Sequence, residues 1–396
     1  MNDAIDASLA RVQMTRARTG DHRLHLLAKR TWSVARGGRP QPSQVQAPIL
    51  GAAVDYQDAP LPQADPDLYA CLRDGTDLVV QGHAHSLRGP VARMQVGVSV
   101  LADAGDDHAA RPPALRLDVV GDRRVHQRGE GARVLFSAPE PFTTMPVRFD
   151  RAYGGRDRWA EAARPDPVAE RYARRAGVPI AHLSKYLYPR NPMGRGYLVH
   201  PDRAALEELA LPNLEWPSDQ LTPERLLLHA SGAWPRAPLP AAFDWVDQSW
   251  FPRIAWFGTR LRHAVGADAF DEVKKGVLRP EQVVSGEPLV AELDERFFRG
   301  TIPRLALPAF TGRETVIVVG MHPTERRFRV SLPTPPELVL EAPGARPRAL
   351  VPALRTLVVR PELEQIETLW VGSMPLARPM TGTELEGVRQ AVTFDD

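Results

Sequence analysis

Apolar and polar residues alternate along several stretches of the first 155 residues, which is typical of β-strands with one buried face. In residues 91–100, a methionine and three valines occupy every second position. Residues 115–119 repeat this pattern, and Gly121 with Asp122 forms a turn signal before a short apolar run near Val125, which together predict a hairpin. The same region predicts further strands over 24–34 and 78–81 and a polar loop at 103–107.

The middle of the chain, residues 156–285, has a different pattern, in which short runs of helix formers are interrupted by proline. These runs predict two helices within 159–176, one over 204–210, one over 223–230 with Thr222 as N-cap, and one over 268–275 that ends at Gly276. Because such helices are too short to form a core alone, we expect nearby tryptophans to pack them, with exposed anchors for a partner as the alternative. The tryptophans are Trp216, Trp234, Trp245, Trp250 and Trp256.

The last region, residues 286–396, returns to strand patterns, and Thr381 with Glu384 forms a capping box for a short final helix. Strands are predicted over 315–321, 328–332, 338–340, 355–360 and 366–371. The sequence therefore predicts a mainly β (α+β) fold, with an antiparallel β-sandwich or barrel-like sheets and short helices inserted in the middle. The three regions could be separate units or one continuous domain over about 20–375.

Composition supports short strands and shaped loops, because 39 of the 396 residues are proline, roughly twice the usual share of ~5%. Proline lacks a backbone donor and collects in loops and at sheet edges. The net charge is only +2. A nucleic-acid-binding domain usually carries a strong cluster of positive charge. The mildly basic first forty residues are expected to be a solvated surface, so no nucleic-acid partner is expected.

The cellular location is expected to be the cytoplasm. The first twenty residues contain charged side chains where a signal peptide needs an apolar stretch, and no apolar run approaches the ~20 residues of a membrane span. No membrane partner is therefore expected. Cys71 is the only cysteine, which excludes an intrachain disulfide and a cysteine-based zinc site.

His83 and His85 are the one candidate for metal chemistry, since residues two apart on a strand point to the same face. Such a pair can supply two ligands to zinc or iron. A metal-dependent hydrolase would place an acidic residue and another histidine after them, whereas Ser86 and Leu87 follow here. The sequence also contains no nucleophile elbow, phosphate-binding loop or dinucleotide motif. We therefore expect a protein without catalytic activity or cofactor, with the hydrolase as an alternative.

Several short segments, in this order, resemble a family of bacterial proteins encoded in type VI secretion loci, beside genes for the spike, its PAAR-type tip and effectors. The segments are residues 76–84, 120–123, 141–142, 145–146, 151–155, 190–197, 211–215, 356–359 and 369–370. The chain departs from the family at residues 258–261, where Gly-Thr-Arg-Leu stands in place of Gly-Thr-Tyr-Asp.

The resemblance implies an adaptor or chaperone that binds an effector or its PAAR-like domain and promotes its stability and loading onto the spike. It implies a type VI effector, a PAAR-like tip or a spike protein as partner. A structural component exported with the spike is a further alternative. The residues implied to shape the binding loops or to contact the partner are Arg151, Tyr153, Gly154, Gly155, Arg190, Asn191, Gly194, Arg195, Asn213 and Trp250.

Overall fold

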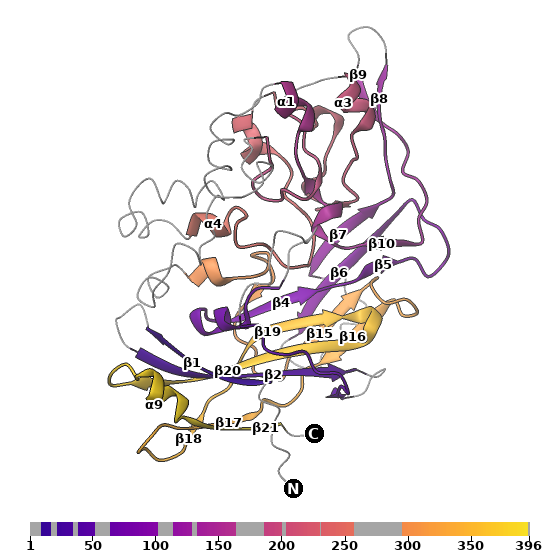
Figure 1. Cartoon of the computed structure of the whole chain (residues 1–396). Helices are drawn as coiled ribbons and strands as arrows, with labels where there is room; N and C mark the ends of the chain where they lie inside the picture. Colours follow the sequence, from indigo (N-terminus) through magenta and orange to yellow (C-terminus); the bar gives the residue numbers. More distant parts are fainter. Residues whose placement is uncertain are drawn as a thin grey trace.

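The structure is a computed structural model of the whole chain, and strands dominate it (Figure 1). It describes residues 9–16, 22–34, 39–51, 64–101, 114–128, 133–163, 186–199, 203–229, 231–256 and 295–394. The expected loop at 103–107, the expected helix over 268–275, residues 164–176 and the departure at 258–261 lie outside the described residues.

The largest sheet has seven strands and joins the two ends of the chain. Its order is β1–β2–β20–β19–β4–β14, with β3 also paired to β2. The strands are β1 (Ala10–Arg16), β2 (His22–Ser33), β3 (Gln41–Pro42), β4 (Thr76–Val80), β14 (Ala306–Leu307), β19 (Ala353–Arg360) and β20 (Gln365–Leu376). Neighbours are antiparallel except β19 and β4, which are parallel. The N-terminal and C-terminal β-regions therefore share one sheet, a question that the sequence left open.

A second, five-stranded antiparallel sheet has the order β13–β7–β6–β15–β16. Its strands are β6 (Arg93–Leu101), β7 (Leu115–Val120), β13 (Leu214–Glu215), β15 (Thr315–Val319) and β16 (Arg327–Ser331). The inward faces of the two sheets contribute to one hydrophobic core, in which Trp32 and Trp370 from the first sheet belong with Val96 and Val318 from the second. This is the packing of a sandwich. Both sheets are open, so the mainly β prediction is confirmed in its sandwich-like form.

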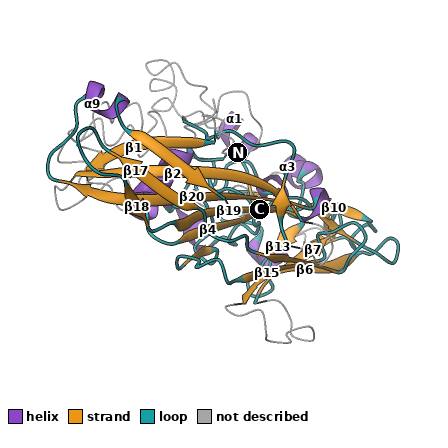
Figure 2. Cartoon of the chain, turned by 90° about the horizontal axis from the view of Figure 1, so that it is seen from below, coloured by secondary structure: helices purple, strands orange, loops and turns teal. Residues whose placement is uncertain are grey.

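The remaining strands form smaller units around this sandwich (Figure 2). A three-stranded sheet, β18 (Arg348–Leu350), β17 (Glu337–Glu341) and β21 (Arg389–Thr393), packs its apolar side chains against those of β2. Three pairs complete the β-structure: β5 (His83–His85) with β10 (Thr144–Pro146), β8 (Val125–Arg128) with β9 (Arg133–Phe136), and β11 (Tyr153–Gly154) with β12 (Arg195–Gly196).

The described helices are short, as the prolines predict. The described α-helices are α1 (Arg158–Ala163), α3 (Arg203–Glu208), α4 (Arg253–Trp256) and α9 (Gly382–Glu386), and 3-10 helices of one or two turns cover Asp67–Leu72, Phe149–Arg151, Pro223–Arg225, Ser231–Arg236, Glu295–Phe298 and Pro361–Leu363. The capping box of Thr381 and Glu384 is confirmed, because both reciprocal hydrogen bonds are present. Within the described residues, no helix combines the length and the apolar character that crossing a membrane requires.

Two local predictions are wrong. The strand near Val125 does not return along β7, because β6 and β13 already occupy the two sides of β7 and β8 pairs with β9 instead. The helix expected over 223–230 is a single 3-10 turn at Pro223–Arg225 in the described residues, and the side chain of Thr222 makes no capping hydrogen bond. By contrast, the expectation that tryptophans pack the middle segment is confirmed for Trp216, Trp245 and Trp250, which are buried in apolar clusters.

Candidate functional site

Three segments that are far apart in the sequence meet beside β7, and we call them the loop core. The loop core consists of residues 149–155, 190–197 and 211–215. The parallel pair β11–β12 joins the first two segments, with Tyr153 aligned to Arg195. A bridge between Ala152 and Leu214 joins the first and third segments, and β13 in the third segment pairs with β7. Three of the segments that carry the family resemblance therefore form one unit.

Asn191 is the central crosslink of the loop core. Its side chain is buried, and its Nδ2 donates hydrogen bonds to the carbonyl oxygens of Phe149 at 2.8 Å and Tyr153 at 3.1 Å. Its own carbonyl accepts from the backbone N–H of Gly155 at 2.8 Å. Because buried backbone groups need partners, this one amide stabilises a turn that has no regular secondary structure to satisfy it.

Asn213 and Arg195 extend the same arrangement toward the five-stranded sheet. The Nδ2 of Asn213 donates to the carbonyl of Val120 at 3.0 Å and to Asp122 Oδ1 at 2.9 Å. Arg195 donates from Nη1 to Asn213 Oδ1 at 3.3 Å and from Nε to the carbonyl of Asp150 at 3.0 Å. Partial burial lowers the pKa of Arg195, and the nearby charge of Arg151 adds to this effect.

Glycine is required where the loop segments cross. A Cβ at Gly154 would lie 2.2 Å from the carbonyl oxygen of Asn191, and one at Gly155 would lie 2.4 Å from that of Gly194. Gly155 also has a φ of +96°, which disfavours side chains. The Gly154 and Gly155 pair and Gly194 are therefore explained by close backbone approach.

An aromatic cluster of Tyr153, Tyr188 and Tyr197 packs against the loop core. The rings of Tyr153 and Tyr188 lie 5.2 Å apart, those of Tyr188 and Tyr197 lie 5.4 Å apart, and all three are buried. Burial raises the pKa of all three hydroxyls. Tyr188 donates to the carbonyl of Pro238 at 2.8 Å. The cluster thus stays neutral and gives the loops a rigid base.

A recess of about 340 Å3 opens beside the loop core, and we call it the loop recess. Its lining residues are Asp122, Arg123, Arg124, Glu140, Arg195 and residues 207–211. Arg123 is buried and donates to the carbonyl of Pro212 at 2.6 Å and to Glu215 at 2.8 Å. Arg124 and Glu140 form the outer rim, and the side chain of Arg124 is 77% exposed. The surface beside the loop core is therefore charged, with both signs present.

His83 and His85 do point to the same face, and they converge on a carboxylate that the sequence did not single out. Nδ1 of His83 lies 3.0 Å and Nε2 of His85 lies 2.5 Å from Oε1 of Glu362. Burial alone would raise the pKa of Glu362, but the hydrogen bonds from both imidazoles outweigh it and lower the pKa. Across the described part of the chain, no group of three or more metal-ligating side chains is arranged to hold an ion.

Residues 19–370 match the profile of a family described as "Uncharacterized protein conserved in bacteria (DUF2169)". The chain belongs to this family. No curated protein and no solved structure matches the chain. The match includes the whole loop core, both histidines and Glu362, and it confirms the expected membership of a conserved bacterial family.

In this DUF2169 protein, the expected partner-binding residues fall into two classes. The side chains of Tyr153, Asn191, Asn213 and Trp250 are buried, and Trp250 packs edge-on against Phe149. Buried side chains of this kind determine the shape of the loops. Three arginines remain partly exposed at the surface of the loop core: Arg151, Arg190 and Arg195.

Sequence reasoning about this DUF2169 chain missed the rim of the loop recess. Arg124 and Glu140 carry no motif of their own. Their neighbour Arg123, however, belongs to the segment 120–123 that resembles the family, so this segment was the available signal.

Proposed function

We propose that this protein is a cytoplasmic adaptor or chaperone of type VI secretion, which binds an effector or its PAAR-like tip domain and promotes loading onto the spike. The observation that carries the proposal is the set of hydrogen bonds that the side chains of Asn191, Asn213 and Arg195 make. Asn191 and Arg195 donate hydrogen bonds to carbonyl oxygens of the loop core. Arg195 also donates to Asn213, whose amide in turn donates to the carbonyl of Val120 on β7. A surface that is rigid before binding loses less entropy on association, which favours recognition of another protein.

The exposed and partly exposed groups beside this rigid unit are suited to a protein partner. Arg190 places its guanidinium 5.0 Å from the ring centre of Trp234, and Arg124 extends into solvent at the rim of the loop recess. Arginine and tryptophan are enriched among the residues that dominate binding energy in protein interfaces. The mixed charges of the loop recess would then give orientation and selectivity to the contact.

The test is co-expression with the effector and tip proteins of the same genetic locus. We expect a higher soluble yield of one of them and a complex that co-elutes in size-exclusion chromatography. Arg124→Glu, at the rim of the loop recess, should weaken this complex, whereas Arg348→Glu, exposed on β18, should leave it unchanged. If no product of the locus co-elutes with the wild-type protein, the proposal is wrong.

One alternative, a structural component exported with the spike, is separated from the adaptor by cell fractionation. An adaptor remains in the producing cell, whereas a spike component appears in the secreted fraction. Secretion of this chain together with the spike would replace the adaptor proposal.

The other alternative, a metal-dependent hydrolase, rests on the approach of Glu362 to His83 and His85, although the imidazoles are hydrogen-bonded to the carboxylate and no group of three ligands in the described part of the chain is arranged to hold an ion. Two imidazoles and a carboxylate form a common ligand set for zinc and iron. Elemental analysis of the purified protein decides here. A stoichiometric metal that is lost in His85→Ala would favour the hydrolase, and metal-free protein would remove it.

A further inference from the structure

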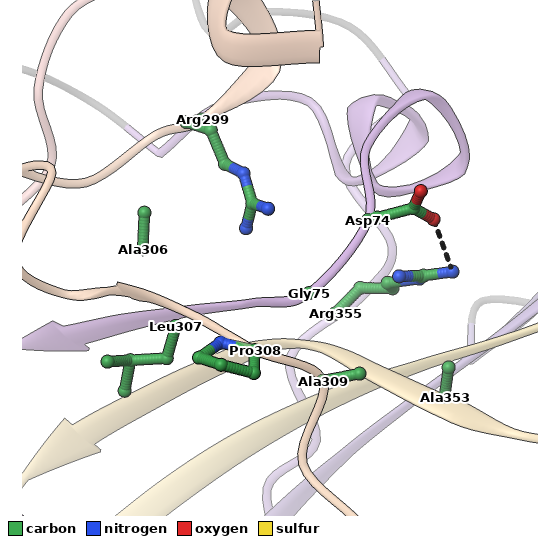
Figure 3. Close-up of a pocket in the computed structure, with 9 residues that line it drawn as sticks. All are labelled: Asp74, Gly75, Arg299, Ala306, Leu307, Pro308, Ala309, Ala353 and Arg355. Atoms are coloured by element: carbon green, nitrogen blue, oxygen red, sulfur yellow. Dashed lines mark ion pairs between the residues drawn. The ribbon is translucent and has the colours of Figure 1, made fainter.

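A second recess, of about 590 Å3, lies at the β14 end of the seven-stranded sheet and shares no lining residue with the loop recess. We call it the edge recess. It is lined by Asp74, Gly75, Arg299, Ala306, Leu307, Pro308, Ala309, Ala353 and Arg355. Figure 3 shows Arg299 reaching into it from one side and Arg355 lying beside Asp74 on another.

The two guanidinium groups differ in how they are held. Arg299 donates from Nη1 to Asp77, which is completely buried, at 3.2 Å. Arg355 faces Asp74, and their closest charged atoms are 3.5 Å apart. The side chain of Arg355 is 16% exposed and that of Asp74 is 89% exposed. An ion pair with one partner so exposed is weak, so Asp74 can be exchanged for another carboxylate at little cost.

The residues that line the edge recess carry a surplus of positive charge, with two guanidinium groups against the carboxylate of Asp74, while the carboxylate of Glu295 lies just outside the lining, 3.4 Å from the backbone N of Asp74. Asp77 is shared, since it also accepts from the backbone N–H of Gly300 at 2.7 Å and lies 3.4 Å from Arg73. Burial lowers the pKa of Arg355, and Arg73 and Arg299 add to this effect while Asp74 opposes it. The Nε of Arg355 is buried and has no hydrogen-bond partner among the residues that the structure describes. An incoming carboxylate would therefore relieve repulsion among guanidinium groups and desolvation of a charge.

The local backbone keeps this arrangement in place. Gly75 has a φ of +74°, and a Cβ there would lie 2.3 Å from the carbonyl oxygen of Leu307 and 2.9 Å from Nη2 of Arg299. Only glycine lets the chain run this close to both groups. Gly75 lies directly before residues 76–84, one of the segments that resemble the family.

The wall of the edge recess suits an extended peptide more than a small acid. Residues 306–309, Ala-Leu-Pro-Ala, form an apolar strip beside the arginines. Pro308 follows β14 directly and has no N–H, so addition of a further strand is disfavoured on this edge. Side chains of a bound peptide can pack on the strip while its carboxylate meets the arginines.

We propose that the edge recess binds a carboxylate of an acidic peptide segment from a partner protein, with Arg299 and Arg355 as its contacts. In the unbound chain, Asp74 takes the place of that carboxylate. This inference rests on the proposed function only in that the ligand belongs to a protein partner, and it adds the chemistry of one contact.

The test uses the purified full chain and fluorescein-labelled peptides in fluorescence anisotropy. One peptide contains Ala and Glu with an amidated C-terminus, its counterpart contains Gln in place of Glu, and a third has only uncharged side chains and a free C-terminal carboxylate. We expect the Glu peptide or the free C-terminus to bind, and the Gln peptide to bind about tenfold more weakly or not at all. The two binding arms distinguish side-chain from terminal carboxylates.

Asp74→Asn is the decisive variant, because a residue with a merely structural role would not improve binding when it is changed. Removing the internal carboxylate should tighten peptide binding by about two- to fivefold. Glu386→Gln, an exposed change of the same charge on α9, should not. Arg355→Gln should weaken binding by about tenfold, with thermal unfolding as a check that the fold is kept.

The inference is overturned if neither carboxylate peptide binds the wild-type protein, or if Asp74→Asn binds no more tightly than Glu386→Gln. If the peptide test fails but a stable effector complex forms, the edge recess does not bind a carboxylate and the adaptor proposal stands. Peptide binding without a stable effector complex would support the edge-recess inference and contradict the adaptor proposal.

Discussion

Arg253 and Asp65 form a bidentate ion pair inside the protein, with Nη1–Oδ1 and Nη2–Oδ2 distances of 3.1 and 2.8 Å. The two side chains are 4% and 9% exposed. Arg253 also donates from Nε to the carbonyl of Phe297 at 2.9 Å. The pair thus connects α4 of the middle segment to the chain that leads into the seven-stranded sheet.

Replacing Asp65 with alanine should destabilise the protein by about 3–5 kcal/mol, because it leaves a buried guanidinium without its counter-charge. The control is Arg389→Ala, which removes an exposed pair with Glu341 at 4.0 Å and should change stability by less than about 1 kcal/mol. Urea unfolding of both variants measures the difference. Equal losses of unfolding free energy in the two variants would show that the buried ion pair stabilises the protein no more than the exposed one.

Gly155→Ala should destabilise the loop core more than Gly89→Ala, although the two glycines have nearly the same φ, +96° and +94°. At Gly89 the added Cβ meets no atom within 4 Å among the described residues beyond its two chain neighbours, so only backbone strain of about 1–2 kcal/mol applies. At Gly155 the Cβ meets the carbonyl oxygen of Gly194 at 2.4 Å, which should add about 1–3 kcal/mol. Thermal unfolding of both variants tests this, and similar melting temperatures would contradict the close approach.

Most of the longer strands of both sheets could be predicted because their signal is local, whereas β1 and the two-residue strands β3, β13 and β14 were missed. In β6 and β16, burial alternates over at least part of each strand, and the residues themselves show that period. The capping box of Thr381 and Glu384 is equally local, since four consecutive residues contain the whole signal. Their sheet partners could not be predicted, because β2 and β20 are more than three hundred residues apart in the chain.

The sites depend on the same long-range order. The convergence of His83 on Glu362 needs the pairing of β4 with β19, which no local pattern encodes. The loop core was signalled only by its glycines and asparagines. Which carbonyl oxygen each amide would meet depends on how three distant segments cross.

Stability should fall as the pH drops from 6.5 toward 4, in part because of His25. This residue is buried on β2 and hydrogen-bonds through its two ring nitrogens with Thr15 at 2.6 Å and Ser373 at 2.7 Å. Burial, with the charges of Arg23 and Arg355, lowers the pKa of His25 from 6.5 to about 4. Below pH 6.5 the His25 side chain therefore binds a proton in the unfolded chain but not in the folded chain. This difference lowers the free energy of unfolding by about 3 kcal/mol at pH 4.

In His25→Asn this contribution disappears, so the difference in unfolding free energy between pH 7 and pH 4 should be smaller than in the wild type. Carboxylates such as Glu362 act below about pH 4.5 in both proteins and cancel in the comparison. His126→Asn, at an exposed position on β8, should follow the wild-type profile. A wild-type profile for His25→Asn as well would mean that His25 is protonated in the folded protein.

The donor role of Asn191 gives the sharpest test of the loop core, because aspartate has nearly the same shape and lacks the N–H groups. Asn191→Ala should destabilise the protein by about 1–3 kcal/mol, since the carbonyl oxygens of Phe149 and Tyr153 lose a donor. Asn191→Asp should be worse at pH 7, because it places a carboxylate against those two oxygens. Its pKa would rise, so the penalty should shrink as the pH falls and the protonated acid can donate one hydrogen bond. Urea unfolding at pH 7 and pH 5 measures this, and an Asn191→Asp variant as stable as the wild type at pH 7 would show that the amide does not hold the loops together.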